Sequence, residues 1–335
     1  MRAACLLLAV FLAAAAPAAA QERTDPAAEL MSRTYCLAPL PAGPVAAGTT
    51  FGIVLFDPPS ADAAAAAAPL GAPRPGLKLP DSVNDLLYQD GRLYVANGPA
   101  GLRVVSVAPD GALALEAHVP TEGAAMTLTR DGTRLFVAQA VMGVAVVDIT
   151  EPSSPVRIAT LSTEGYARHV AVQHTVGGSG GDATLYVANG DGGLVALKVD
   201  QDLALLTAAV LPVKGDVRRV ALEAGRLYFS RGSRGVCSIL PGLDPASMSC
   251  IDVKDVGRDL VVVDGRVLVA DGGEGVAAID WADPAAPKVL GRYKPAQGSM
   301  NRILVVGDRI FVAADYAGAL SLPLADVLAA PQKVQ

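Results

Sequence analysis

A short strand-like phrase occurs six times along the chain, and its spacing limits the possible folds more than any other feature. The copies occupy residues 91–96, 133–138, 183–188, 225–230, 265–270 and 308–313. Equivalent positions, from Val95 to Val312, lie 42, 50, 42, 40 and 43 residues apart. A period of about 40–45 residues is typical of a four-stranded β-propeller blade. We therefore expect an all-β fold with a single propeller.

The residues around each phrase complete a four-stranded meander. A short apolar strand such as residues 169–172 precedes the phrase, and a glycine and a further apolar run follow it. Turn dipeptides such as Asn97-Gly98 supply the positive φ of tight hairpins. The strands are apolar almost throughout, which favours sheets covered on both faces. A glycine-rich insertion at residues 174–182 accounts for the interval of 50 residues between the second and third copies of the phrase.

Two segments connect the repeats with a known family. Residues 146–156 read Val-Val-Asp-Ile-Thr-Glu-Pro-Ser-Ser-Pro-Val, and residues 278–289 echo them. On these segments the chain resembles the LVIVD-repeat β-propeller proteins over about residues 81–322, with departures at residues 237–240 and 320–322. The Leu-Tyr-Val-Ala-Asn-Gly phrases are also similar to YVTN-type repeats. The resemblance implies a propeller that is exported, and it implies no particular reaction.

The number of blades depends on how the two ends of the chain are used. The sixth repeat ends near residues 319–322 without a fourth strand. We expect residues 76–80 to supply that strand and close a six-bladed ring, because pairing the chain ends hides exposed sheet edges. Residues 51–57 resemble the third strand of a blade, so seven blades are the alternative.

The N-terminus has the pattern of a secretory signal peptide. Arg2 precedes an apolar run, and small residues lead up to Gln21. We therefore expect a signal peptide at 1–20, a poorly ordered extension at 21–49 and the propeller at 50–335. No later segment is apolar enough to span a membrane. These features predict export to the periplasm or the extracellular medium.

Cysteine usage agrees with export. Cys237 and Cys250 fall on two successive predicted strands, so they either form a cross-strand disulfide or remain two small thiols. A bridge would contribute about 3 kcal/mol. Cys36 has no evident partner within the chain.

Residue types that usually carry chemistry are scarce. The three histidines, His118, His169 and His174, form no metal-ligand spacing, and no Cys-x-x-Cys pair is present. The Gly-x-Ser-x-Gly string at 177–181 lies in a hairpin insertion rather than in a strand–turn–helix, which favours a solvated linker. We expect no metal, no cofactor and no catalytic residue. The net charge of −6 and the 4% aromatic content argue against nucleic acid as a partner.

One polar pattern is informative, at the start of the first strand of each repeat, which lines the central channel of a propeller. The aligned pairs are Asn84-Asp85, Met126-Thr127, Arg168-His169, Arg218-Arg219, Arg258-Asp259 and Asn301-Arg302. They hold five arginines and two aspartates. One member of each pair projects toward the channel and the other toward a neighbouring blade, but alternation alone does not say which.

This pattern suggests an anion-binding channel. Arginine forks make paired hydrogen bonds to carboxylate or phosphate. The candidate ligand-binding residues are Arg168, Arg218, Arg258, Arg302, His169, Asp85 and Asp259. The alternative is structural: the arginines pair with acidic residues or with backbone carbonyls of the next blade.

Three functions fit these observations. The first is a binding or scaffold module at the cell envelope that holds a protein, a glycan or a small anion. The second is a hydrolase resembling the propeller lactonases, which needs a catalytic cluster at one mouth of the channel. The third is a purely structural envelope component, which predicts a broad contact surface instead of a pocket.

Overall fold

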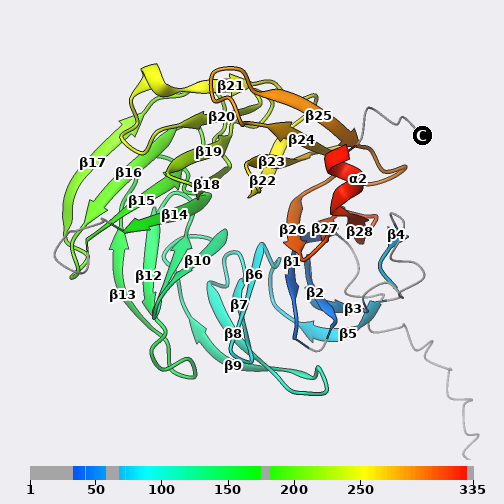
Figure 1. Cartoon of the computed structure of the whole chain (residues 1–335). Coiled ribbons are helices and arrows are strands. Elements are labelled where there is room, and N and C mark those ends of the chain that lie inside the picture. Colours follow the sequence, from blue (N-terminus) through cyan, green and yellow to red (C-terminus); the bar gives the residue numbers. More distant parts are fainter. Residues whose placement is uncertain (1–32, 42, 58–67, 72, 175–181, 330–335) are drawn as a thin grey trace, which may run out of the picture.

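The computed structural model describes residues 33–41, 43–57, 68–71, 73–174 and 182–329. Within these residues, seven four-stranded antiparallel sheets are arranged around a central channel (Figure 1). This confirms the all-β propeller and corrects the expected blade number from six to seven. The signal peptide expected at residues 1–20 lies outside the described residues.

Each blade runs from an inner strand at the channel to an outer strand at the rim. The first four sheets comprise β1 (Thr34–Pro39), β2 (Val45–Thr49), β3 (Gly52–Phe56) and β5 (Pro73–Lys78); β6 (Asp85–Gln89), β7 (Arg92–Ala96), β8 (Leu102–Val107) and β9 (Leu113–Val119); β10 (Thr127–Asp131), β11 (Arg134–Ala138), β12 (Val144–Asp148) and β13 (Val156–Leu161); and β14 (His169–His174), β15 (Ala183–Ala188), β16 (Leu194–Val199) and β17 (Leu205–Leu211).

The remaining three sheets continue the same order, and the last of them takes its outer strand from near the N-terminus. They comprise β18 (Arg219–Glu223), β19 (Arg226–Ser230), β20 (Val236–Ile239) and β21 (Ser249–Ile251); β22 (Gly257–Val263), β23 (Arg266–Asp271), β24 (Val276–Asp280) and β25 (Lys288–Tyr293); and β26 (Arg302–Val306), β27 (Arg309–Ala313), β28 (Ala319–Pro323) and β4 (Ala68–Pro69). The 3₁₀ helix η2 (Pro245–Ser247) and the helix α2 (Leu324–Ala329) complete the described elements.

The N-terminal segment differs from expectation in two respects. Residues 34–49, expected within a poorly ordered extension, form β1 and β2, the inner strands of the first blade. Residues 76–80 were expected to close the last blade, but Pro73–Lys78 is the outer strand of the first blade. The ring is closed instead by Ala68–Pro69, which pairs with β28. The expectation of a third strand at residues 51–57 is confirmed by β3, Gly52–Phe56.

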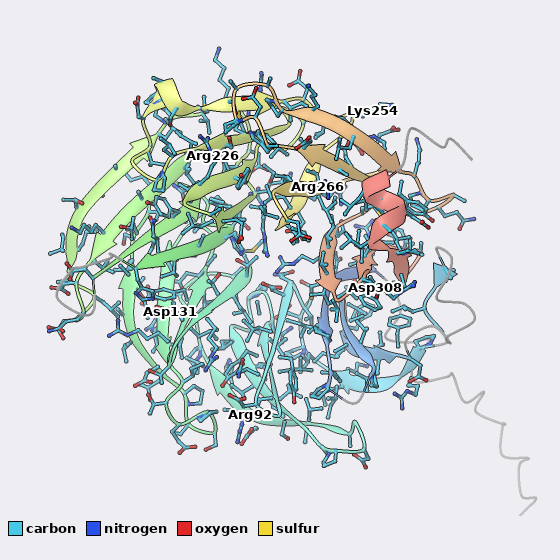
Figure 2. All side chains as sticks on the ribbon, in the orientation of Figure 1. Arg92, Asp131, Arg226, Lys254, Arg266 and Asp308 are labelled. Atoms are coloured by element: carbon cyan, nitrogen blue, oxygen red, sulfur yellow. A yellow bond between two sulfur atoms is a disulfide. The ribbon has the colours of Figure 1, made fainter. Side chains whose placement is uncertain are left out.

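The repeated phrase forms the second strand of each blade from the second to the seventh. In β7, for example, Leu93 and Val95 are completely buried. The hydrophobic clusters bridge neighbouring blades: one of them joins Phe136 of the third blade to Leu185 of the fourth. Side chains fill the spaces between blades (Figure 2). Because each apolar face is covered only by the next blade, the ring has to be complete to bury its core.

The residue after the phrase anchors the loop that enters the inner strand of the same blade. Asn189 donates from Nδ2 to the carbonyl of Glu164, and Asp271 accepts from the backbone N–H groups of Lys254 and Asp255. Gly190, which follows Asn189, has a φ of 61°, as the expected tight turn requires. These turns therefore organise the blade.

Cys237 and Cys250 form a disulfide between the paired strands β20 and β21, which confirms the cross-strand bridge. Such bonds are typical of oxidising compartments. Cys36 is a buried free thiol. No helix among the described residues has the length and apolarity needed to cross a membrane.

Candidate functional site in the central channel

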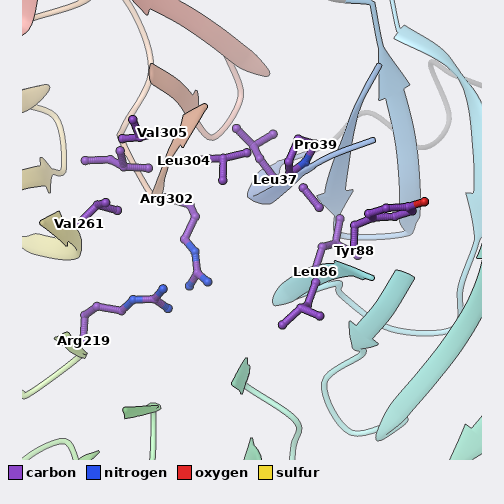
Figure 3. Close-up of a pocket in the computed structure, with 12 residues that line it drawn as sticks. Leu37, Pro39, Leu86, Tyr88, Arg219, Val261, Arg302, Leu304 and Val305 are labelled. Atoms are coloured by element: carbon purple, nitrogen blue, oxygen red, sulfur yellow. The ribbon is translucent and has the colours of Figure 1, made fainter. Parts of the chain in front are cut away.

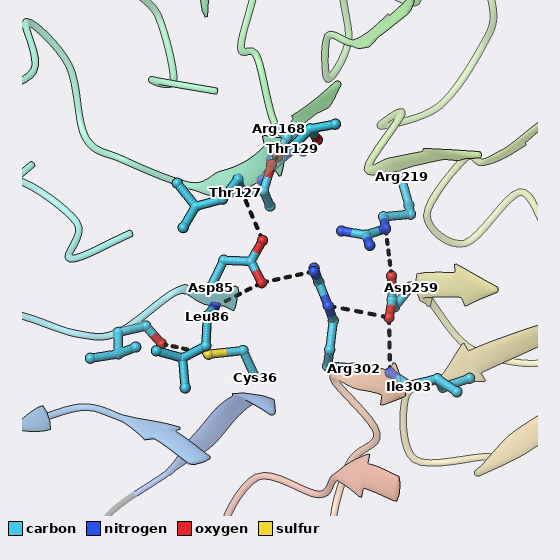
Figure 4. A network of polar contacts seen from close by, with 12 residues as sticks. Cys36, Asp85, Leu86, Thr127, Thr129, Arg168, Arg219, Asp259, Arg302 and Ile303 are labelled. Carbon is cyan, nitrogen blue, oxygen red and sulfur yellow. Dashed lines mark hydrogen bonds and ion pairs between the residues drawn. The ribbon is translucent and has the colours of Figure 1, made fainter. Parts of the chain in front are cut away.

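The paired positions on the inner strands separate into two layers along the channel. The second members form a buried network, which we define as Asp85, His169, Arg219, Asp259 and Arg302. Figure 4 shows Asp85, Arg219, Asp259 and Arg302 of this network. Cys36 occupies the equivalent position of the first blade, because it pairs with Gly48 as Asp85 pairs with Ala96. The first members lie at the end of the channel where the inner strands begin.

Ion pairs across the channel hold the buried network together. Arg302 donates from Nη2 to Oδ1 of Asp85 at 2.8 Å, and its Nε lies 3.6 Å from Oδ2 of Asp259. The Nε of Arg219 lies 2.9 Å from Oδ1 of Asp259. These contacts connect the second, fifth, sixth and seventh blades directly.

The two carboxylates also bind the backbone of the following blade. Asp85 accepts from the N–H of Leu128 through Oδ2 at 3.0 Å, and Asp259 accepts from the N–H of Ile303 at 2.8 Å. Both aspartates are 1% exposed. A buried carboxylate that receives backbone donors from the next blade fixes how the two blades meet. This contact supports the structural interpretation for Asp85 and Asp259.

The charges of the buried network balance. Burial, together with the nearby charges of Arg219 and Arg302, holds the pKa of His169 well below its usual value, so His169 is neutral. Burial, reinforced by Arg302, lowers the pKa of Arg219 to about 10, which leaves it charged near neutral pH. Two guanidinium groups therefore face two carboxylates.

Two adjoining cavities of about 360 and 460 Å³ lie beyond the buried network, toward the ends of the inner strands. Both are lined by Leu87, Arg219 and Val261. Most of the other residues that line the two cavities are aliphatic. In the smaller cavity, the guanidinium groups of Arg219 and Arg302 point toward each other (Figure 3). We call this region the apolar end of the channel.

The opposite end carries a second group, which we call the arginine mouth: Arg168, Arg218, Arg258 and Asp216. Asp216 accepts from Nε of Arg168 at 2.7 Å and also faces Nη2 of Arg218 at 2.8 Å. Arg258 donates to the amide oxygen of Asn301 at 2.5 Å. Burial lowers the pKa of Arg218, and the charges of Arg168 and Arg258 lower it further. Three guanidinium groups thus lie near one carboxylate, which pairs with two of them.

The structure sorts the sequence-predicted residues into these two layers. Arg168, Arg218 and Arg258 converge at the mouth, whereas Arg302, His169, Asp85 and Asp259 belong to the buried network. Sequence reasoning missed Asp216, which lies in the loop before β18. It also left Arg219 out of the candidate residues, although the alignment pairs Arg219 with Arg218. Arg219 could have been recognised from the sequence, because it is a charged residue at the position equivalent to Asp85 and Asp259.

Among the described residues, no group of three or more His, Cys, Asp or Glu side chains is placed to hold a metal ion. No observation on these residues identifies a catalytic group.

Comparison with known proteins supports the repeat assignment and the fold. Residues 122–163 match the LVIVD repeat family. No curated protein sequence matches the chain significantly.

Three solved structures illustrate the shared architecture. The WD40 β-propeller domain of Doa1 is 10% identical, with a TM-score of 0.65 over 87% of this chain and 92% of that one. Virginiamycin B lyase from Staphylococcus aureus is 12% identical, with a TM-score of 0.62 over 87% and 94% of the two chains. Sqt1 from Saccharomyces cerevisiae is 10% identical, with a TM-score of 0.61 over 88% and 96%. At these identities the likeness extends to the fold alone.

Proposed function

We propose that this protein is an exported binding module of the cell envelope that holds a small anion at the arginine mouth of its channel. The observation that carries the proposal is the charge imbalance there. Arg168 and Arg218 share the carboxylate of Asp216, and the nearby Arg258 adds a third positive charge but bonds only the neutral amide of Asn301. Converging positive charges in a narrow opening raise the local concentration of anions.

Two buried donor atoms at the mouth strengthen the case. The Nε atoms of Arg218 and Arg258 are inaccessible to solvent and have no hydrogen-bond partner among the described residues. Buried donors normally find partners, so such atoms mark a place where a ligand would gain hydrogen bonds. Arg168 and Arg218 are about a third exposed, at 28% and 34%, so an anion can reach them.

Export is supported by the residue pattern before Gln21 and by the Cys237–Cys250 disulfide. The test is expression with the native N-terminus, cell fractionation and mass spectrometry of the product. We expect a chain that begins at Gln21 outside the cytoplasm. A cytoplasmic chain that retains residues 1–20 would contradict export.

Anion binding is tested by titration calorimetry with inorganic phosphate and a dicarboxylate. We expect Arg218→Gln to weaken the binding of the preferred anion by about tenfold or more, because a charge-assisted hydrogen bond contributes about 1.5–3 kcal/mol. Arg226→Gln is the matched control, since Arg226 bonds Ser238 within the fifth blade, away from the mouth. Equal affinities of the parent and Arg218→Gln would contradict the proposed site.

A hydrolase of the propeller-lactonase type, the alternative left open by the sequence, is favoured by no observation on the described residues. The candidate partners are therefore a small anion at the mouth and a protein or glycan on the propeller surface.

A further inference from the structure

The apolar end of the channel is a separate region from the arginine mouth. Its walls come from the later residues of the inner strands, such as Leu87, Val261 and Leu304. The two adjoining cavities, of about 360 and 460 Å³, fall in the range of about 300–1,000 Å³ that is usual for small-molecule sites.

The polar side chains that line the larger cavity are Thr129, Arg130, His169, Arg219 and Glu223, and two of them have a buried atom that is unpartnered in the described part of the chain. Nη1 of Arg219 and Nδ1 of His169 are buried atoms with no hydrogen-bond partner among the described residues. Both side chains line the larger cavity. The neighbouring carboxylates do not satisfy them, because Asp85 is occupied by Arg302 and backbone donors, and Asp259 meets Arg219 only at Nε.

We infer that this cavity binds an amphiphilic carboxylate, with its carboxylate against Arg219 and its hydrocarbon chain along the wall formed by Leu87 and Val261. Arg219 supplies the planar fork that suits a carboxylate. A single negative charge fits the site better than a polyanion, because each buried charge needs its own partner and Arg219 offers one guanidinium nitrogen that is unpartnered among the described residues. The site is distinct from the anion site of the proposed function.

The ligand class is tested with three probes that separate the contribution of the carboxylate from that of the hydrocarbon chain. Octanoate carries both parts, octanol has a comparable chain without the charge, and acetate has the charge without the chain. Titration calorimetry below micellar concentrations should show octanoate binding at least about tenfold more tightly than octanol, with acetate weaker still. Equal affinities for octanol and octanoate would overturn the role of Arg219, and no octanoate binding would overturn the site.

Two adjacent residues at the start of β18, Arg218 and Arg219, provide matched variants that separate this site from the arginine mouth. Arg219→Gln should weaken octanoate binding by about tenfold or more and leave phosphate binding intact. Arg218→Gln should do the reverse. If phosphate binding fails while octanoate binding depends on Arg219, only the proposed function is wrong. If octanoate binding fails while phosphate binding depends on Arg218, only the present inference is wrong.

A cavity-filling variant guards against misfolding of Arg219→Gln. Leu87 is partly exposed and lines both cavities, so Leu87→Trp fills the space without removing a charge. We expect it to abolish octanoate binding and keep the melting temperature of the free protein near that of the parent. Octanoate binding unaffected by Leu87→Trp would place the ligand outside the channel and overturn the inference.

Discussion

Each arginine of the mouth is the sequence neighbour of a residue of the buried network at the start of an inner strand, yet the two charged layers differ in burial and in charge balance. In the buried network, Asp85 and Asp259 are each 1% exposed and are paired with arginines and with backbone N–H groups. At the arginine mouth, Asp216 is 25% exposed and neutralises only part of the charge around it.

This difference separates Asp85, Asp259 and Arg302, which support the fold, from the arginines of the mouth, which remain available to a small anion. A buried charge has lost its hydration and must be fully compensated by the protein. A partly exposed charge can be compensated by water, and water is exchanged readily for a ligand. The same residue type, arginine, therefore has a structural role at Arg302 and a proposed binding role at Arg218.

The largest expected effect contrasts Asp85→Ala with Asp216→Ala. Asp85→Ala removes the carboxylate that the buried guanidinium of Arg302 hydrogen-bonds and leaves only Asp259 nearby, so it should lower the free energy of unfolding by about 3–5 kcal/mol. Asp216→Ala removes a partly exposed pair and should cost less than about 1 kcal/mol. Urea denaturation followed by the fluorescence of Trp281 measures both, and equal losses would break the distinction between the layers.

An intermediate effect concerns pH. Because the pKa of His169 is depressed in the folded state, the unfolded chain binds the proton more readily once the pH falls below about 6.5. The free energy of unfolding should therefore decrease toward acidic pH, with His169 contributing up to about 1.4 kcal/mol per pH unit.

His169→Gln should flatten this slope between about pH 6.5 and pH 5, above the range where carboxylates titrate. The matched control is His118→Gln, which alters an exposed imidazole on β9. Denaturant titrations at several pH values measure the slope. An unchanged slope in His169→Gln would show that the folded protein accommodates a charged His169.

The smallest expected effect concerns Asp216 as a competitor for the arginines of the mouth. Asp216→Asn removes the carboxylate that occupies Arg168 and Arg218, so phosphate affinity should rise by about threefold to fivefold, equivalent to a surface pair of roughly 1 kcal/mol. Titration calorimetry at constant ionic strength measures it. Weaker binding in this variant would mean that Asp216 positions the arginines for the anion.

Much of the fold could be predicted from local sequence. The phrase of residues 133–138, the glycine turns and the two cysteines on successive strands each indicate structure within a few residues of themselves. The first two strands of the first blade were missed, because β2 reads Val-Ala-Ala-Gly-Thr where the other blades have a phrase similar to Leu-Tyr-Val-Ala. A side chain at Gly48 would collide with Cys36 and Val83, so the small residue there reflects a contact that the phrase does not contain.

The candidate site, like the fold, could be predicted from the sequence only in part. Alignment of the repeats found the inner-strand positions, but it did not reveal which member of each pair is buried. It also did not reveal that Asp216, in a loop, neutralises part of the arginine mouth.

The sequence by itself determined the propeller and the positions that line the channel, because burial on both faces and tight turns leave local patterns. It placed Cys237 and Cys250 on successive strands but left open whether they are bonded. The tertiary structure alone decided the number of blades, the closing strand and the pairing of charges. The reason is distance along the chain. Arg302 reaches Asp85 across 217 residues, and β28 pairs with Ala68–Pro69 from the other end of the protein. Contacts of this kind exist only once the ring has closed.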